Sequence, residues 1–193
     1  MLRWIQRALF ALAFVAFAYC AYVMTESWIF QREETRNLGR LVVAHQTAIT
    51  DTLPAPEVWE QVQPGELIGR ISVARLGVSV IVMEGTDGST LRRAAGHISG
   101  TALPGQQGNV GIAAHRDTFF RPLRDIRKDD VITVTTSRGD YRYRVVSTRV
   151  VDPDDVSVLN SDGNDVLTLV TCYPFDFIGA APSRFIVRAE QIS

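Results

Sequence analysis

An apolar run close to the N-terminus limits most strongly how this chain can fold. Ala8 to Met24 (ALFALAFVAFAYCAYVM) are 17 consecutive residues without a charge, which is at the short end of the length that spans a bilayer as a helix. Trp4 and Trp28 flank the run. At 1.5 Å per residue they would lie about 36 Å apart, at the two membrane interfaces. We therefore expect a membrane-spanning helix over residues 8–30.

The charges on either side of the run predict its orientation. Arg3, Arg7 and the terminal amine precede it, whereas Glu26 is the first charge after it. By the positive-inside rule, residues 1–7 stay in the cytoplasm and the chain from residue 30 onward lies outside. The expected protein is a single-pass membrane protein whose folded part faces the cell surface or the periplasm.

Two other interpretations of the run are weaker. A cleaved signal peptide has a similar charged start and apolar core, but this run is longer than a usual signal-peptide core and AYCAYVMTES offers poor small-residue cleavage sites. Lipoprotein-type cleavage at Cys20 is disfavoured because the bulky Tyr19 precedes it. We expect the run to be kept as an anchor.

Residues 31–65 are expected to join the anchor to the folded domain. Their first part mixes charged and apolar residues without proline, so the membrane helix can continue outward as a stalk. Pro54, Pro56 and Pro64 then indicate an extended linker. A single folded domain is expected over residues 66–193, because domains typically run about 100–200 residues.

Composition argues against a nucleic-acid partner, an intrachain disulfide and a zinc site. The net charge is −1 and charged residues make up 21% of the chain, so no basic face recommends nucleic acid as a partner. The two cysteines are Cys20, inside the apolar run, and Cys172, so no intrachain disulfide is expected. A zinc site has weak support because His45, His97 and His115 lack the paired spacing of zinc ligands.

Short β-type segments separated by turn signals follow Gly65. Strands are expected over residues 67–73, 78–85, 109–115, 130–136, 140–151, 165–171 and 184–190, with one short helix over 89–96 that has a serine cap and a glycine stop. Strands and helices do not alternate regularly, which disfavours a parallel doubly wound sheet. We expect a mainly antiparallel sandwich or barrel.

Three reactive residues fall at the ends of expected strands. Cys172 ends one strand and Arg184 begins the next, so antiparallel pairing would place both at one rim of the sheet. His115 ends a third strand. Whether that third end meets the other two is not fixed by the sequence.

Cysteine, histidine and arginine together would suffice for acyl transfer. The thiolate is the nucleophile, and a free cysteine with a pKa of about 8.5 is only slightly ionised at neutral pH. A histidinium can supply a stabilising charge and then protonate a departing amine, while a guanidinium holds the oxyanion. Asp117 is close enough in sequence to His115 to be considered as its orienting group.

Structural roles compete with each of these assignments. A lone cysteine at a strand end is more often a small buried hydrophobe. Arg188 lies on the same strand face as Arg184 by alternation, and His97 is a second candidate base. Composition and spacing alone leave the choice between an enzyme and a non-catalytic barrel open.

Three motifs in order resemble the sortase family of membrane-anchored cysteine transpeptidases. TLVTC (168–172) resembles the family's strand ending in cysteine, GIAAHRDTFF (111–120) its histidine segment, and SRFIVRAE (183–190) its arginine strand. Residues 91–117 are especially similar to the subgroup called class D. The resemblance runs from Leu67 to Ile192 and implies a closed β-barrel of about eight strands with one or two short helices.

The resemblance also implies roles for individual residues. Cys172 would be the nucleophile, His115 the general acid and base, and Arg184 the group that holds the oxyanion or orients the substrate. Thr171 and Asp117 would lie near the substrate.

Two positions differ from that pattern of catalytic residues. His97 does not match the family's catalytic histidine, so a structural or pocket-lining role is expected. Ala114 stands where glycine is commoner in the subgroup, which is tolerable unless the position needs a positive φ angle.

The implied function is cleavage of an LPxT-type C-terminal sorting signal through a thioester, followed by transfer of the protein to an amine. The expected partners are membrane-tethered substrate proteins, an amine acceptor from the cell wall or a pilin, and the membrane. No cofactor or metal is expected; some family members use calcium, but no acidic cluster here has the spacing for it. The alternatives are a membrane-anchored thiol protease, which passes the acyl group to water, and a non-catalytic peptide-binding barrel.

Overall fold

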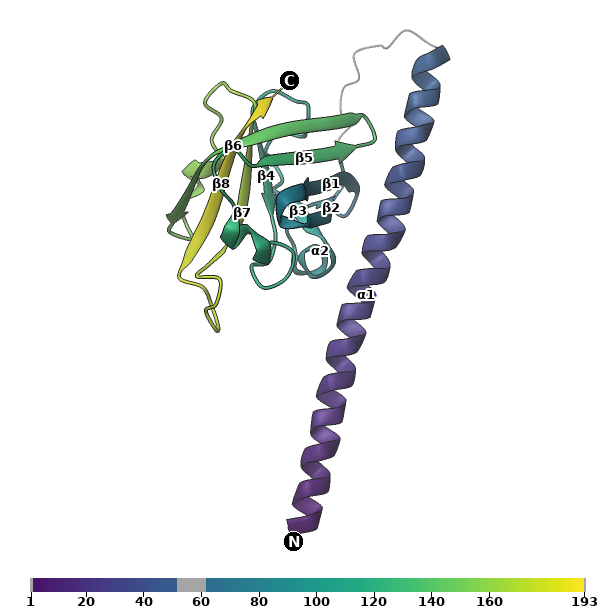
Figure 1. Ribbon diagram of the computed structural model, residues 1–193, viewed down its shortest axis with the longest axis vertical. Coiled ribbons are helices and arrows are strands. Elements are labelled where there is room, and N and C mark those ends of the chain that lie inside the picture. The colour runs from purple at the N-terminus through teal and green to yellow at the C-terminus, as the bar shows by residue number, and fades with distance from the viewer. Residues whose placement is uncertain (1, 52–61, 193) are drawn as a thin grey trace.

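The computed structural model describes residues 2–51 and 62–192 and consists of a long helix beside a small β-barrel (Figure 1). The strands are β1 (Leu67–Val73), β2 (Val78–Glu84), β3 (Ala95–His97), β4 (Asn109–Ala113), β5 (Val131–Thr136), β6 (Gly139–Val151), β7 (Val166–Tyr173) and β8 (Ser183–Ile192). The helices are α1 (Leu2–Asp51) and α2 (Gly88–Arg93), with 3-10 turns η1 (Ala74–Leu76), η2 (Arg121–Asp125) and η3 (Val156–Leu159).

The eight strands close into a barrel in the order β1-β2-β3-β4-β7-β8-β6-β5. The pairs β2–β3 and β4–β7 are parallel and the other pairs are antiparallel, so the barrel is mixed but mainly antiparallel. The closed barrel predicted from the sequence is confirmed.

Alternating apolar residues fill the interior of the barrel. Side chains of a strand point to opposite faces in turn, and the inward set includes Ile71, Ile112, Val134, Leu167 and Val187, all buried in one cluster. Closure also pairs both edges of every long strand, which removes the exposed edges of an open sheet. The barrel therefore gives its rims a rigid support.

The segment after β2 differs from the sequence prediction. The helix is shorter than predicted and is capped by Asp87 rather than by a serine, because the Asp87 carboxylate accepts hydrogen bonds from the backbone of Ser89 and Thr90. The hydroxyls of Ser89 and Thr90 also donate to this carboxylate and, with the two backbone bonds, hold the pKa of Asp87 well below its usual range. The chain then enters β3, where a side chain on Gly96 would collide with the Gly85 carbonyl, so this glycine permits close strand pairing rather than ending the helix.

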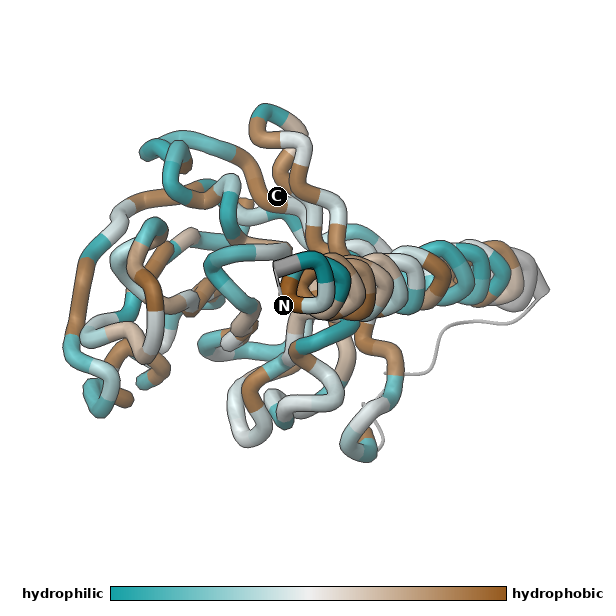
Figure 2. Tube along the Cα trace, turned by 90° about the horizontal axis from the view of Figure 1, so that it is seen from below, coloured by the Kyte–Doolittle hydropathy of each residue, from teal (hydrophilic) through white to brown (hydrophobic). Residues whose placement is uncertain are grey.

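Helix α1 is long and apolar enough to cross a membrane. Within Arg3–Ala44 an 18-residue window has a mean hydropathy of 2.0 and is not covered by the barrel. Figure 2 shows hydrophobic turns near the N-terminus and more hydrophilic turns farther along the helix. The helix runs without a break through the predicted membrane segment and into the predicted stalk, whose exact boundaries stay predictions. Pro54 and Pro56 of the predicted linker lie outside the described residues.

The middle of α1 docks on the barrel beside β2. The Gln31 amide donates to the carbonyl of Arg93 at the end of α2 (2.6 Å), and its oxygen accepts from the Ile81 amide (2.9 Å). Strand β3 pairs with β2 only from Val82 onward, so Gln31 covers the edge of β2 just before β3 begins. Phe30 packs beside it on a small cluster formed by Ile81, Met83 and Ala94. The helix thus has a defined orientation on the barrel.

We predict that Gln31→Ala loosens this contact. Loss of a single hydrogen bond costs about 1 kcal/mol, so exchange of the Ile81 amide with solvent should become at least about fivefold faster in the full chain. Arg40→Ala, an exposed position on the same helix, is the control. Unchanged exchange in Gln31→Ala would show that α1 does not dock through this residue.

Candidate active site

Strands β4, β7 and β8 are neighbours in the barrel and bring the three predicted catalytic residues to one rim. Parallel pairing of β4 with β7 sets Ala113 opposite Val170, so His115, two residues beyond β4, comes level with Cys172. Antiparallel pairing of β7 with β8 sets Cys172 directly opposite Arg184. The strand ends that the sequence left unconnected therefore meet.

Cys172 and Arg184 also share one face of the sheet. Leu167 and Leu169 of β7 point into the core, so alternation directs Cys172 outward. Directly opposite residues of an antiparallel pair lie on the same face. Cys172 and Arg184 are half-buried and His115 is exposed. The groups are thus supported by the barrel and still open to solvent.

One side-chain hydrogen bond connects the cysteine strand to the histidine segment. The buried Thr171 hydroxyl donates to the carbonyl of Ala114 (2.7 Å), and the Ala114 amide donates to Val170 (3.2 Å). Among the described residues only Asp129 combines a side chain with a positive φ. Ala114 therefore does not have a positive φ angle. The position accommodates a methyl group where the subgroup more commonly has glycine.

The guanidinium of Arg184 lies against the start of its own strand. Its Nη1 donates to the carbonyls of Ser183 (3.1 Å) and Ala181 (3.4 Å). The competing Arg188 is paired with Asp162 instead. The two arginines therefore differ in their partners: Arg184 donates to backbone carbonyls, whereas Arg188 forms an ion pair.

Arg116, which sequence reasoning did not single out, joins the histidine segment to the β7–β8 loop (residues 174–182). Its Nη2 donates to the carbonyls of Phe177 (2.6 Å) and Gly179 (3.0 Å). Arg124 pairs with Asp176 in the same loop (2.7 Å) and holds the pKa of that carboxyl below its usual value. Only its place directly after His115 could have drawn attention to Arg116, because its partners are backbone carbonyls distant in sequence.

His97 lies apart from this rim. It is 2% exposed, with its ring nitrogens within hydrogen-bonding distance of the Glu84 carboxylate and the Ala102 carbonyl. The Ser99 hydroxyl donates to the same carboxylate (2.6 Å). These contacts suit a structural role that ties β2 to β3, and its substrate-binding role stays a prediction.

Asp117 is exposed two residues beyond His115. In the described part of the chain it has no hydrogen bond or ion pair with that histidine. Its orienting and substrate-binding roles stay predictions.

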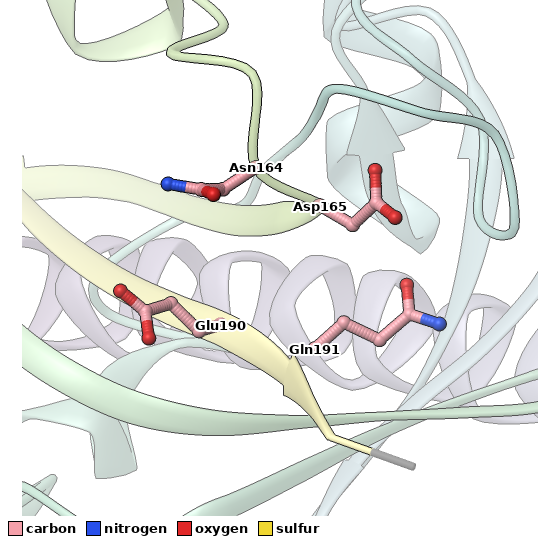
Figure 3. A pocket seen from close by; sticks show the side chains of 4 residues that line it. All are labelled: Asn164, Asp165, Glu190 and Gln191. Carbon is pink, nitrogen blue, oxygen red and sulfur yellow. The ribbon is translucent and has the colours of Figure 1, made fainter.

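A concave site lies at the end of β7 and β8 opposite the catalytic rim. Asn164, Asp165, Glu190 and Gln191 line it, and Figure 3 shows the two carboxylates pointing away from each other. Asp165 already accepts a hydrogen bond from the Gly108 amide (3.0 Å). Within residues 2–51 and 62–192 no three potential metal ligands gather. The arrangement gives no metal site.

Comparison with known proteins assigns the folded domain to a family. Residues 71–192 match the model of the sortase domain. The chain belongs to the sortase family. Sortases are cysteine transpeptidases, so the enzyme class predicted from the three motifs is confirmed.

Individual relatives agree with the assignment to the sortase family. Sortase D of Bacillus subtilis (strain 168) is 31% identical over 132 residues, which cover 68% of this chain and 67% of that protein. A solved Clostridium perfringens sortase D5 transpeptidase superposes with a TM-score of 0.69 at 24% identity, over 85% of this chain and 99% of the other. Sortase C of Clostridium perfringens, solved with the C-terminal cell wall sorting motif, gives 0.63 at 25% identity, over 83% and 90%.

We predict that Thr171→Val destabilises the rim. Valine keeps the shape of threonine but leaves the Ala114 carbonyl without its donor, which should cost about 1–3 kcal/mol in the free energy of unfolding. Denaturant unfolding of the full chain measures this, with Thr171→Ser as the control that keeps the hydroxyl. Equal stability of the valine and serine variants would rule out the hydrogen bond as a link between β7 and the histidine segment.

Proposed function

We propose that this sortase uses Cys172 to cleave a C-terminal sorting signal of the LPxT type and to transfer the protein to an amine at the cell surface. The observation that carries the proposal is the register of three adjacent strands, which sets Cys172 opposite Arg184 and level with His115. The Clostridium perfringens sortase C that was solved with the C-terminal cell wall sorting motif supports a sorting signal as the class of substrate.

The first step is attack of the Cys172 thiolate on the carbonyl carbon before the scissile peptide bond. The charge that develops on the carbonyl oxygen is stabilised by the guanidinium of Arg184. Protonated His115 donates to the departing amine, so the peptide bond breaks and a thioester remains on the cysteine.

The second step transfers the acyl group. An incoming amine loses a proton to His115 and attacks the thioester, which releases Cys172 as a thiolate and forms a new amide bond. The exposed position of His115 supports this exchange of substrates at one rim. The acceptor is an amine of the cell wall or of a pilin.

The proposed setting is the outer face of the cytoplasmic membrane. Helix α1 would span the bilayer with its N-terminus inside, because Arg3 and Arg7 precede the apolar run and Glu26 follows it. Substrate proteins tethered to the same membrane would then reach the barrel without diffusing through the cell envelope.

We expect Cys172→Ala to abolish formation of the acyl-enzyme. Mass spectrometry of the full chain with LPxTG- and LPxTA-type peptides should show a thioester adduct and, when an amine is added, a product that contains it. Cys20→Ser is the matched control and should retain both. An adduct that persists in Cys172→Ala would exclude this cysteine as the nucleophile, and a product with only a free carboxylate would favour the thiol protease.

We expect Arg184→Lys to lower kcat at least about 100-fold, because a planar guanidinium can donate to both an oxyanion and a neighbouring carbonyl, and loss of one such donor typically costs about 10²–10³ in rate. Arg188→Lys, on the same strand face, should change kcat little. Steady-state transpeptidation of the same peptide measures both. Equal activity of the two variants would remove Arg184 from the mechanism.

A further inference from the structure

The tip of the β7–β8 loop presents two large apolar side chains to solvent. Ile178 is 96% exposed, the highest fraction among the exposed large apolar residues of the described barrel, and the adjacent Phe177 is 45% exposed. Gly179 and Ala180, which follow, carry no polar side chain. An exposed apolar tip of this kind indicates a surface that meets an apolar partner.

The tip is held in place by contacts from the neighbouring loop. Arg116 donates to the carbonyls of Phe177 and Gly179, and Arg124 pairs with Asp176. These bonds satisfy polar groups at the base of the tip while the side chain of Ile178 stays uncovered. The loop thus presents its apolar residues as a fixed feature of the rim.

The tip points in the direction of the membrane anchor. Figure 1 shows that the β7–β8 loop extends farther toward the N-terminal end of α1 than the rest of the barrel. The docking of Gln31 on β2 and α2 fixes this orientation. The apolar tip is therefore on the side from which α1 enters the bilayer.

The barrel also reaches down to the level of the apolar run. Ser89 and Arg92 of α2 line a groove together with Tyr19 and Tyr22 of α1, which belong to the outer third of the run. With the apolar run in a bilayer, α2 would therefore lie at the outer membrane interface. Arg92 and Arg93 end α2 there, and cationic side chains suit the level of the lipid phosphates.

We propose that Phe177 and Ile178 enter the outer leaflet of the bilayer that α1 spans, and so hold the catalytic rim against the membrane surface. The proposal rests on the membrane anchor of the proposed function. Because the tip belongs to the loop that joins Cys172 to Arg184, its contact with lipid would set the height at which a membrane-tethered substrate meets the cysteine.

The test measures the depth of a nitroxide label in the full chain, reconstituted in nanodiscs of phosphatidylcholine and phosphatidylglycerol. Ile178→Cys is labelled in a Cys20→Ser, Cys172→Ala background. Val156→Cys is the matched control: Val156 is 71% exposed, and its turn η3 contacts Asn109, at the end of β4 remote from His115. A third sample carries the label on native Cys20 in Cys172→Ala and reports on the anchor.

Relaxation of each label by oxygen and by a water-soluble nickel chelate gives the depth. We expect the label at position 178 to be reached by the chelate at least about fivefold less than the label at 156, and the label at Cys20 to be deeper still. Equal access of the chelate to positions 178 and 156, with Cys20 immersed, would overturn the proposed contact and leave the anchor intact. If the chelate reached the label at Cys20, the membrane anchor would be refuted, and the proposed contact of the loop with lipid would be refuted as well.

Discussion

The pairing of β7 with β4 on one side and with β8 on the other is the constraint on which the candidate site depends. Parallel pairing with β4 brings His115 level with Cys172, and antiparallel pairing with β8 sets Arg184 opposite Cys172. A shift by a single residue would turn the cysteine into the core, because side chains alternate between faces. Closure of the barrel and the bond from Thr171 to Ala114 oppose such a shift. The chemistry is therefore a consequence of strand register.

Local signals explain why so much of the barrel could be predicted. Alternating apolar residues and turn residues located seven of the eight strands, and the β7–β8 pairing followed from two strands joined by a loop. The cysteine and the arginine were placed together on that basis alone. The position of His115 beside them could not be predicted from local signals, because its strand pairs with β7 in parallel and the two segments are far apart in the chain. The family resemblance supplied that link before the structure did.

The features that could not be predicted from the sequence depend on contacts between segments far apart in the chain. Strand β3 is three residues long, and the sequence pattern of its glycine is that of a helix stop, although the residue in fact approaches the Gly85 carbonyl closely. Gln31 and Arg116 both bind backbone groups distant in sequence, and such partners leave no periodic pattern. His97 was ambiguous for the same reason, because the carboxylate of Glu84 beside it comes from another strand. Of these residues, Gln31 sets the orientation of the helix on the barrel and Arg116 supports the loop at its rim.

In the proposed mechanism His115 and Cys172 act as one unit, and the rate of alkylation of Cys172 with and without His115 measures their coupling. Iodoacetamide reacts with the thiolate, which is the form in which Cys172 attacks in the proposed mechanism. The full chain with Cys20→Ser should be alkylated at Cys172 at least about tenfold faster near neutral pH than the same chain with His115→Ala, whereas His97→Ala should have little effect beyond any loss of folding seen by circular dichroism. Equal rates with and without His115 would show that the histidine does not activate the cysteine.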